Sequence, residues 1–303
     1  RGDNNFMRYD YVYRGEDWVS EDIIIERFIV HESVTVVIGD TMRESKSMVE
    51  AICHDKVEKI GEYFFELCDD LRRVIMPGVK IVERYAFIYC EALTDVECGK
   101  LENVGVRAFY GCESLKSIEL PSARIVQWEA FATCGALTDV KFGGKLERIE
   151  DDAFMNCTSL ERITIPLKDG IIAEHDYDVF TGCEKLKHVD LVEGELLRET
   201  IAALHLEEWR NDMHEEIDSI DQILLTAHAG YYDDDEDDNV EGEKAVALRT
   251  WIRSLLGKIM HYKAEHRRLL DEDVAPTLQR FLPQDIVMND VLPFLDLPPH
   301  SFE

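Results

Sequence analysis

The sequence predicts an α+β repeat fold, in which a solenoid with a parallel sheet on one face is followed by an all-α helical hairpin. Two observations carry this prediction. A motif of about 22 residues recurs between residues 34 and 192, and beyond residue 192 the apolar residues change to a spacing of three and four. The first pattern is typical of stacked repeats and the second of amphipathic helices.

The recurring motif is anchored on a phenylalanine. A Cys stands three residues after each anchor, a Leu six after, and a β-branched residue nine after. Successive anchors are 22, 22, 22, 23 and 26 residues apart. The six anchors are Phe65, Phe87, Phe109, Phe131, Phe154 and Phe180.

One unit of this length cannot bury its own apolar residues, so the units must stack. Each unit is expected to contain one short strand, "LxxVxL", and a turn around "AFxxC". Stacking then places Phe on Phe and Leu on Leu along the axis. A degenerate copy with Met42 in the Phe position is expected to cap the start. The resulting division is an N-terminal extension at 1–33, a solenoid at 34–192 and a helical region at 193–303.

Six of the eight cysteines occupy the same position of the repeat. A metal or disulfide array and a ladder of buried thiols both fit this pattern. The sequence contains no CxxC spacing, which argues against zinc. Laddered side chains also point the same way rather than toward each other. We therefore expect free thiols and a reducing compartment, cytoplasmic or nuclear.

Copies such as "AFYGCESLKSIELP" (Ala108 to Pro121) resemble the BspA-like leucine-rich repeats, and the resemblance covers roughly residues 34–192. It implies a leucine-rich-repeat solenoid and, more weakly, protein binding. Repeats followed by such a helical tail are also similar to uncharacterised BspA-like proteins of diatom algae. Relatives that act at cell surfaces imply the alternative localisation, extracellular or cell surface.

The outward positions of the strand motif form the candidate binding face. Residues eight and ten after each Phe point away from the core and line the sheet. We predict a polar, protein-binding face of mixed charge, although an ordinary solvated sheet face fits the same pattern. The candidate residues are Arg73, Asp95, Glu97, Ser117, Glu119, Asp139, Lys141, Arg162, His188 and Asp190.

The C-terminal third is expected to be helical. Apolar spacing predicts helices over 195–225 and 243–270, packed as an antiparallel hairpin. Its tip is an acidic loop at 230–243, whose six consecutive acids fit no EF-hand register. The following tail is expected to bury its apolar side chains, which are Phe281, Leu282, Ile286, Val287, Val291, Leu292, Phe294 and Leu295.

The net charge and the absence of known motifs exclude several classes of function. The formal net charge is −30, which disfavours nucleic acid and favours a basic protein partner. No apolar run is long enough for a membrane span. The sequence carries no catalytic, phosphate-binding or metal motif, so no enzyme activity, cofactor or metal is predicted.

The sequence leaves three functional hypotheses. The preferred one is a non-enzymatic interaction module or scaffold that uses the sheet face, with the helical tail binding a second partner or another copy of the chain. The second is a secreted or cell-surface adhesion protein, which would have oxidised cysteines. The third is a regulatory subunit of an enzyme complex.

Overall fold

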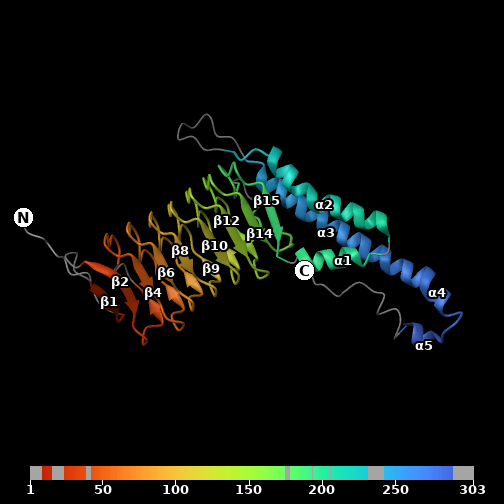
Figure 1. Ribbon diagram of the computed structural model, residues 1–303, viewed down its shortest axis with the longest axis horizontal. Coiled ribbons are helices and arrows are strands. Elements are labelled where there is room, and N and C mark those ends of the chain that lie inside the picture. The colour runs from red at the N-terminus through yellow and green to blue at the C-terminus, as the bar shows by residue number, and fades with distance from the viewer. Residues whose placement is uncertain are drawn as a thin grey trace, which may run out of the picture.

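Short parallel strands stacked along one axis form most of the molecule, and helices continue from the last coil (Figure 1). The computed structural model describes residues 9–15, 24–38, 42–174, 178–192, 194–204, 206–230 and 242–288. The predicted leucine-rich-repeat solenoid and the helical region after it are both present.

The "LxxVxL" strands line one face of the solenoid as two successive parallel sheets. The first sheet contains β1 (Tyr9–Tyr13), β2 (Ile25–Val30), β4 (Glu50–Ile52), β6 (Arg73–Ile75) and β8 (Asp95–Glu97). The second contains β10 (Ser117–Leu120), β12 (Asp139–Phe142), β14 (Arg162–Ile165) and β15 (His188–Leu191). Equivalent residues pair directly, as Val140 does with Ile163, so each repeat position forms a row.

A third sheet runs along the opposite side of the coils. It contains β13 (Arg148–Ile149), β11 (Ile125–Val126), β9 (Asn103–Val104), β7 (Ile81–Val82), β5 (Lys59–Ile60) and β3 (Val36–Val37). The prediction of one strand per unit was therefore wrong. These strands have two residues, of which one points inward, so they leave no alternating pattern in the sequence.

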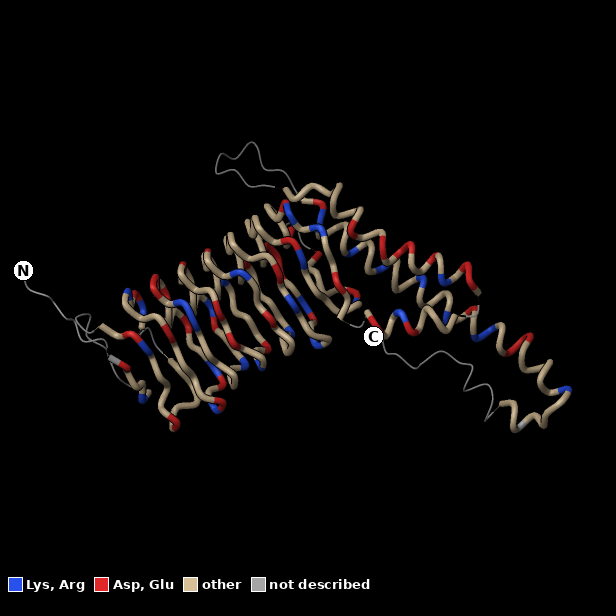
Figure 2. Tube along the Cα trace, in the orientation of Figure 1, with Lys and Arg blue, Asp and Glu red and all other residues tan. Residues whose placement is uncertain are grey.

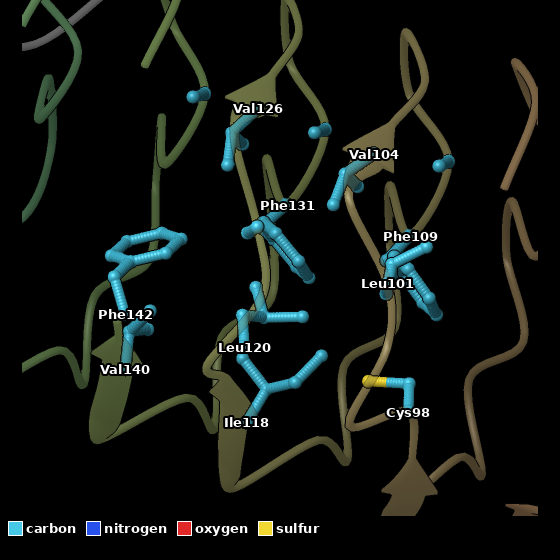
Figure 3. Packing of buried hydrophobic residues seen from close by; sticks show 14 of the residues in the cluster. Cys98, Leu101, Val104, Phe109, Ile118, Leu120, Val126, Phe131, Val140 and Phe142 are labelled. Carbon is cyan, nitrogen blue, oxygen red and sulfur yellow. The ribbon is translucent and has the colours of Figure 1, made fainter. Parts of the chain in front are cut away.

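The interior consists of ladders of identical residues. The six anchor phenylalanines are fully buried and stack face to face, with 5.0 Å and 4° between the rings of Phe87 and Phe109. Figure 3 shows the same repetition for Val104 and Val126 in neighbouring coils. Burial of each such ring contributes roughly 1.5–3 kcal/mol.

The repeat cysteines form a ladder of buried free thiols. The Sγ of Cys90 donates to the carbonyl of Phe65 in the preceding coil at 3.0 Å, and that of Cys112 donates to Phe87 at 3.3 Å. Burial raises the pKa of Cys90 and Cys112 well above its usual value, so both stay protonated and able to donate. The thiols thus satisfy backbone carbonyls between coils.

The solenoid starts earlier than residue 34. Strands β1 and β2 pair in parallel with each other, and β2 pairs with β4. Tyr13 and Phe28 are buried in the same core as the repeats. These strands thus extend the first sheet toward the N-terminus without carrying the Phe motif.

The helical region contains more elements than predicted. They are α1 (Gly194–Ala202), α2 (Glu207–Thr226), α3 (Lys244–Leu269), the π-helix η1 (Leu270–Val274), α4 (Ala275–Leu278) and α5 (Gln284–Ile286). A single helix over 195–225 was wrong. Leu204 and Met213 are nine residues apart, which is half a turn out of phase on one helix. The break between α1 and α2 lets both residues face the core.

Helices α2 and α3 form the antiparallel hairpin that the spacing predicted. Lys258 of α3 pairs with Asp212 of α2 at 2.9 Å, and the indole Nε1 of Trp251 donates to the carbonyl of Glu216 at 2.8 Å. The acidic run from Asp233 to Asp238 lies outside the described residues.

The hairpin supplies hydrogen bonds that a further coil would supply. In inner coils the residue two after Phe donates its N–H to the next coil, as Tyr89 does to Tyr110 at 2.8 Å. The equivalent Gly182 has no next coil, and it donates instead to the carbonyl of Ala229 at 3.0 Å. The helical region therefore completes the end of the solenoid.

Two ionisable side chains, Lys244 and Asp178, complete the contact between the last coil and the helical hairpin, which we name the joint. In inner coils the carbonyl four residues after Phe accepts from the next coil, as Glu91 accepts from Ser114. At Glu184 the Nζ of the buried Lys244 donates instead, at 3.2 Å, and it also donates to the carbonyl of Leu186.

Asp178 plays a similar part. Its Oδ1 accepts the N–H of Phe180 at 2.7 Å, a bond that the next coil makes for the inner phenylalanines.

The insertion before the last repeat also anchors the hairpin. Arg253 of α3 pairs with Asp169 at 3.0 Å and with Glu174, and Arg249 donates to the carbonyl of Ala173. This segment therefore holds α3 against the solenoid.

The prediction for the tail was partly wrong. Val287 is buried with Leu270 and Ala275 in a small separate cluster. Phe281, by contrast, is 81% exposed, and Leu282 and Ile286 are also exposed. The remaining apolar residues of the tail, from Val291 on, lie outside the described residues. Among the helices that the structure describes, none combines the length and apolar character of a membrane span.

Candidate binding surfaces

The predicted sheet face is divided between two sheets. Arg73, Asp95 and Glu97 lie in the first sheet, and the other seven candidates lie in the second, from Ser117 to Asp190. Figure 2 shows acidic and basic positions interleaved along the coils. The ten residues therefore follow one side of the solenoid without forming a single continuous sheet.

The charges on this face pair with one another. Arg73 lies 3.1 Å from Asp95 and 3.7 Å from Glu50, and it also donates to Glu97. The hydrogen bond to Glu97 raises the pKa of Arg73.

The same holds in the second sheet. Lys141 pairs with Glu119 at 3.0 Å, and Arg162 pairs with Asp190 at 2.6 Å. A partner would have to replace these contacts, so the paired charges offer little net attraction.

His188 belongs to the joint with the helices. Its Nδ1 lies 2.9 Å from Oδ2 of Asp221 on α2, and Oδ1 of Asp221 accepts the N–H of Val189 at 3.4 Å. Helix α2 thus contacts the last strand of the face and limits the binding area at this end.

A second surface lies at the turns beside the Phe ladder, and we name it the turn edge. It consists of aromatic side chains from four successive coils around one arginine. They are Tyr63, Tyr85, Tyr89, Tyr110 and Trp128, with Arg107. Tyr89 and Trp128 are 41% and 37% exposed, and the other four are half-buried.

Arg107 organises the turn edge. Its guanidinium lies 4.6 Å from the ring centre of Trp128 and 5.4 Å from that of Tyr110. It also pairs with the buried carboxylate of Glu129, which raises the pKa of Arg107. One cation is thus held by two aromatic rings and one acid.

The backbone fixes the direction of these side chains. Tyr63, Tyr85, Tyr89 and Arg107 all have φ between 52° and 60°, the left-handed region. A Cβ at Gly111 would lie 2.6 Å from the ring of Tyr89, so the absence of a side chain there makes room for that ring. The turn backbone and the space at Gly111 therefore set where the ring of Tyr89 lies before any partner binds.

A buried carboxylate, that of Asp152, lies beside Trp128 at the turn edge. The indole Nε1 of Trp128 donates to Oδ2 of Asp152 at 3.4 Å, while Oδ1 has no hydrogen-bond partner within the part of the chain that the structure describes. Burial raises the pKa of Asp152 to about 6, and Glu129, Asp151 and Asp178 add to the rise.

Sequence reasoning missed the turn edge because it followed only the strand positions. The signal was present in the columns within three residues of each Phe. Those columns read Tyr63, Tyr85 and Arg107 two residues before the anchor, and Tyr110 one residue after it.

The helical hairpin carries exposed apolar side chains. Leu225, Val246 and Met260 are among them, and a hollow of about 460 Å³ lies between Ile223 and Val246 near the end of the hairpin. Nowhere in the described ranges do three or more His, Cys, Asp or Glu side chains form a group suited to a metal ion.

These features define a class of protein. Short parallel strands at a period of about 22 residues, with Phe, Leu and Cys ladders inside, are those of a leucine-rich-repeat solenoid. The family described as "BspA type Leucine rich repeat region (6 copies)" matches residues 20–123 and 80–197. The chain belongs to this family.

Bacterial repeat proteins of known structure are similar to parts of the chain. A leucine-rich repeat protein from Bacteroides ovatus is 24% identical with a TM-score of 0.46, and the match covers 57% of this chain and 44% of that chain. A leucine rich repeat protein of T. pallidum is 21% identical with a TM-score of 0.47, covering 60% and 84%. A leucine rich cell surface protein from Faecalibacterium prausnitzii is 13% identical with a TM-score of 0.25, covering 56% and 80%.

The chain thus spans less than half the length of the Bacteroides ovatus protein. No curated protein matches the chain.

Proposed function

We propose that the chain is a non-enzymatic protein-interaction module whose solenoid presents the binding surface, mainly at the turn edge. The observation that carries this proposal is the group of five aromatic side chains on four successive coils, two of which contact Arg107. Tyr, Trp and Arg are the residues enriched at the energetic centres of protein interfaces. Membership in a repeat family of this kind supports the same function.

The sheet face is the second candidate surface. Its charges are satisfied by neighbours on the same face, as Arg73 is by Asp95, which favours the turn edge over it. The two surfaces are on different parts of each coil, so they can be altered separately.

A cross-linking experiment in source cells tests the proposal. A photo-reactive phenylalanine analogue replaces Tyr89 at the turn edge in one variant and Ser117 on the sheet face in another. We expect a discrete cross-linked protein from position 89 and little from position 117. The reverse pattern would transfer the function to the sheet face, and no product from either would contradict a protein-binding solenoid.

Purified variants then measure the contribution of each surface to capture of the cross-linked protein. The first variant combines Tyr89→Ala and Trp128→Ala, and the second combines Arg73→Gln, Glu97→Gln and Glu119→Gln. We expect the first to lose most of the capture and the second to keep it, with unchanged melting temperatures. Loss of capture in the triple variant alone would indicate that the sheet face is the binding surface.

The hairpin is proposed as the place of self-association. Exposed Leu225, Val246 and Met260 favour contact with a second copy. Sedimentation of the full chain over a concentration series should show a dimer that Met260→Lys abolishes. A monomer at every concentration would remove this part of the proposal.

A further inference from the structure

The charge of the turn edge restricts its partner. The five turn segments at 61–67, 83–91, 105–113, 127–135 and 150–156 contain nine acidic and two basic residues. Both basic residues are already paired, Arg84 with Glu62 at 2.9 Å and Arg107 with Glu129, and two cations outside these segments, Arg43 and Lys59, pair with Glu66 and Glu83. The other five acids are Glu91, Glu113, Glu150, Asp151 and Asp152. An acidic surface with no spare cation is complementary to a basic partner.

Arg107 shows how a cation is held on this surface. Its guanidinium contacts the faces of two rings while a carboxylate accepts its hydrogen bond. This combination of ring faces and acid is worth more than either alone, because the rings exclude water from the ion pair.

The neighbouring coils repeat the rings and acids, and the one cation of their turn segments, Arg84, is paired with Glu62. Tyr63 and Tyr85 stack at 4.9 Å, and Tyr89 packs edge-on against Tyr110 at 5.4 Å. Glu91 lies two residues after Tyr89, and Glu113 occupies the equivalent place one coil further on. Among the residues that the structure describes, no Lys or Arg lies over the ring of Tyr89.

We propose that the turn edge binds a basic segment of a partner protein, whose Arg or Lys side chains lie on the two exposed rings, those of Tyr89 and Trp128, and pair with the acids beside them. This inference rests on the proposed function and adds the chemistry of the partner. It excludes an uncharged ligand, such as an oligosaccharide stacked on the same rings, as the main occupant.

The test uses the full chain and a fluorescein-labelled twelve-residue peptide of alternating Arg and Ser. Fluorescence anisotropy at 150 mM salt gives the dissociation constant. The double variant Tyr89→Ala and Trp128→Ala is compared with Phe281→Ala, which removes an exposed aromatic elsewhere. None of these changes alters the net charge of −30, so unspecific attraction to the acidic chain stays constant.

We expect the double variant to weaken binding about five- to twentyfold, from the loss of two cation–π contacts. Phe281→Ala should bind as the unaltered chain does, and a peptide of alternating Glu and Ser should not bind. Equal binding by all three proteins would overturn the proposal, because attraction would then come from charge alone. Saturable binding of a neutral oligosaccharide in place of the Arg peptide would overturn it as well.

The outcome is separable from that of the proposed function. If the cross-link at position 89 forms but the Arg peptide binds equally to all variants, the turn edge is a protein-binding surface for a partner that is not basic. If no cross-link forms at position 89 and the Arg peptide also binds equally to all variants, both proposals fail.

Discussion

The solenoid and the joint with the helical hairpin bury their surfaces in different ways. Inside the coils, fully buried side chains such as Phe109 and Leu115 repeat from coil to coil. At the joint, the buried side chains include the charged Lys244, and the carboxylate of Asp178 accepts backbone N–H groups from both regions. A repeat can satisfy its backbone only against another repeat, so its last copy needs polar groups from elsewhere.

This difference shows what a solenoid end requires. Apolar contact alone would leave the backbone of the last coil without partners. The side chain of Lys244 and the carbonyl of Ala229 take the places of donors and acceptors that a further coil would provide. Four experiments sharpen or break this comparison, from the largest expected effect to the smallest.

The largest effect is expected inside the ladder. Phe109→Ala leaves a cavity between the rings of Phe87 and Phe131, and it should lower the free energy of unfolding by about 3–5 kcal/mol. Urea unfolding followed by circular dichroism measures this. Phe281→Ala is the matched control and should change the value by less than about 0.5 kcal/mol. Similar effects of both variants would contradict the stacked core.

A substitution at the contact between the last coil and the hairpin should destabilise only that part of the molecule. Lys244→Met removes the donor to the carbonyls of Glu184, Leu186 and Leu224 and leaves an unbranched side chain one atom shorter, which costs about 2–3 kcal/mol for unpartnered buried carbonyls. Hydrogen exchange should rise in α2, α3 and the last coil and stay unchanged in the middle coils.

Lys258→Met, at an outer ion pair of the same helix, is the control with the smaller effect. If Lys244→Met left exchange in the hairpin unchanged, apolar packing alone would hold the joint.

The raised pKa of Asp152 should make the free energy of unfolding depend on pH. Its pKa of about 6 in the folded chain lies above the usual 3.8, so the folded state binds the proton more tightly than the unfolded state. The free energy of unfolding should therefore fall as pH rises from about 4 to about 6.

Asp152→Asn should remove this slope and stabilise the protein at pH 7 by about 1–3 kcal/mol. Asn also tolerates the positive φ of 54° at this position. Thermal melts of both proteins at pH 5 and pH 7 measure this change of stability with pH. An equal change in the two proteins would show that Asp152 is solvated.

The smallest effect is expected on the sheet face. Arg73→Gln breaks three exposed ion pairs, yet exposed pairs stabilise little because water screens them. The melting temperature should stay within experimental error in 150 mM salt. A clear drop would mean that the charge ladder stabilises the coils.

Sequence alone predicted the elements with a period. The repeated Phe, Cys and Leu positions predicted the coils, the side lined by the "LxxVxL" strands and the ladders of buried side chains, because each position recurs at least six times. The strands around Ile60 and Val82 were missed, since a two-residue strand has no period of its own. The break between α1 and α2 was visible in the half-turn between Leu204 and Met213, but single-helix spacing was assumed.

The joint could not be predicted in the same way. Lys244 stands at the start of an amphipathic helix, where lysines are usually solvated, and its partners Glu184 and Leu186 are about 60 residues earlier in the chain. The turn edge was predictable in part, because its tyrosines stand in repeat columns. That Arg107 lies between the rings of Tyr110 and Trp128 required the stacking of adjacent coils in space.

The helical cap recognises backbone groups of the last coil, through Ala229 and the ammonium group of Lys244. Any coil with the same turn would present those groups. A duplication of one internal unit would therefore keep the cap in place and lengthen the molecule by one strand spacing, about 4.8 Å. The solenoid can therefore change in length by whole coils, while the contacts at its two ends stay the same.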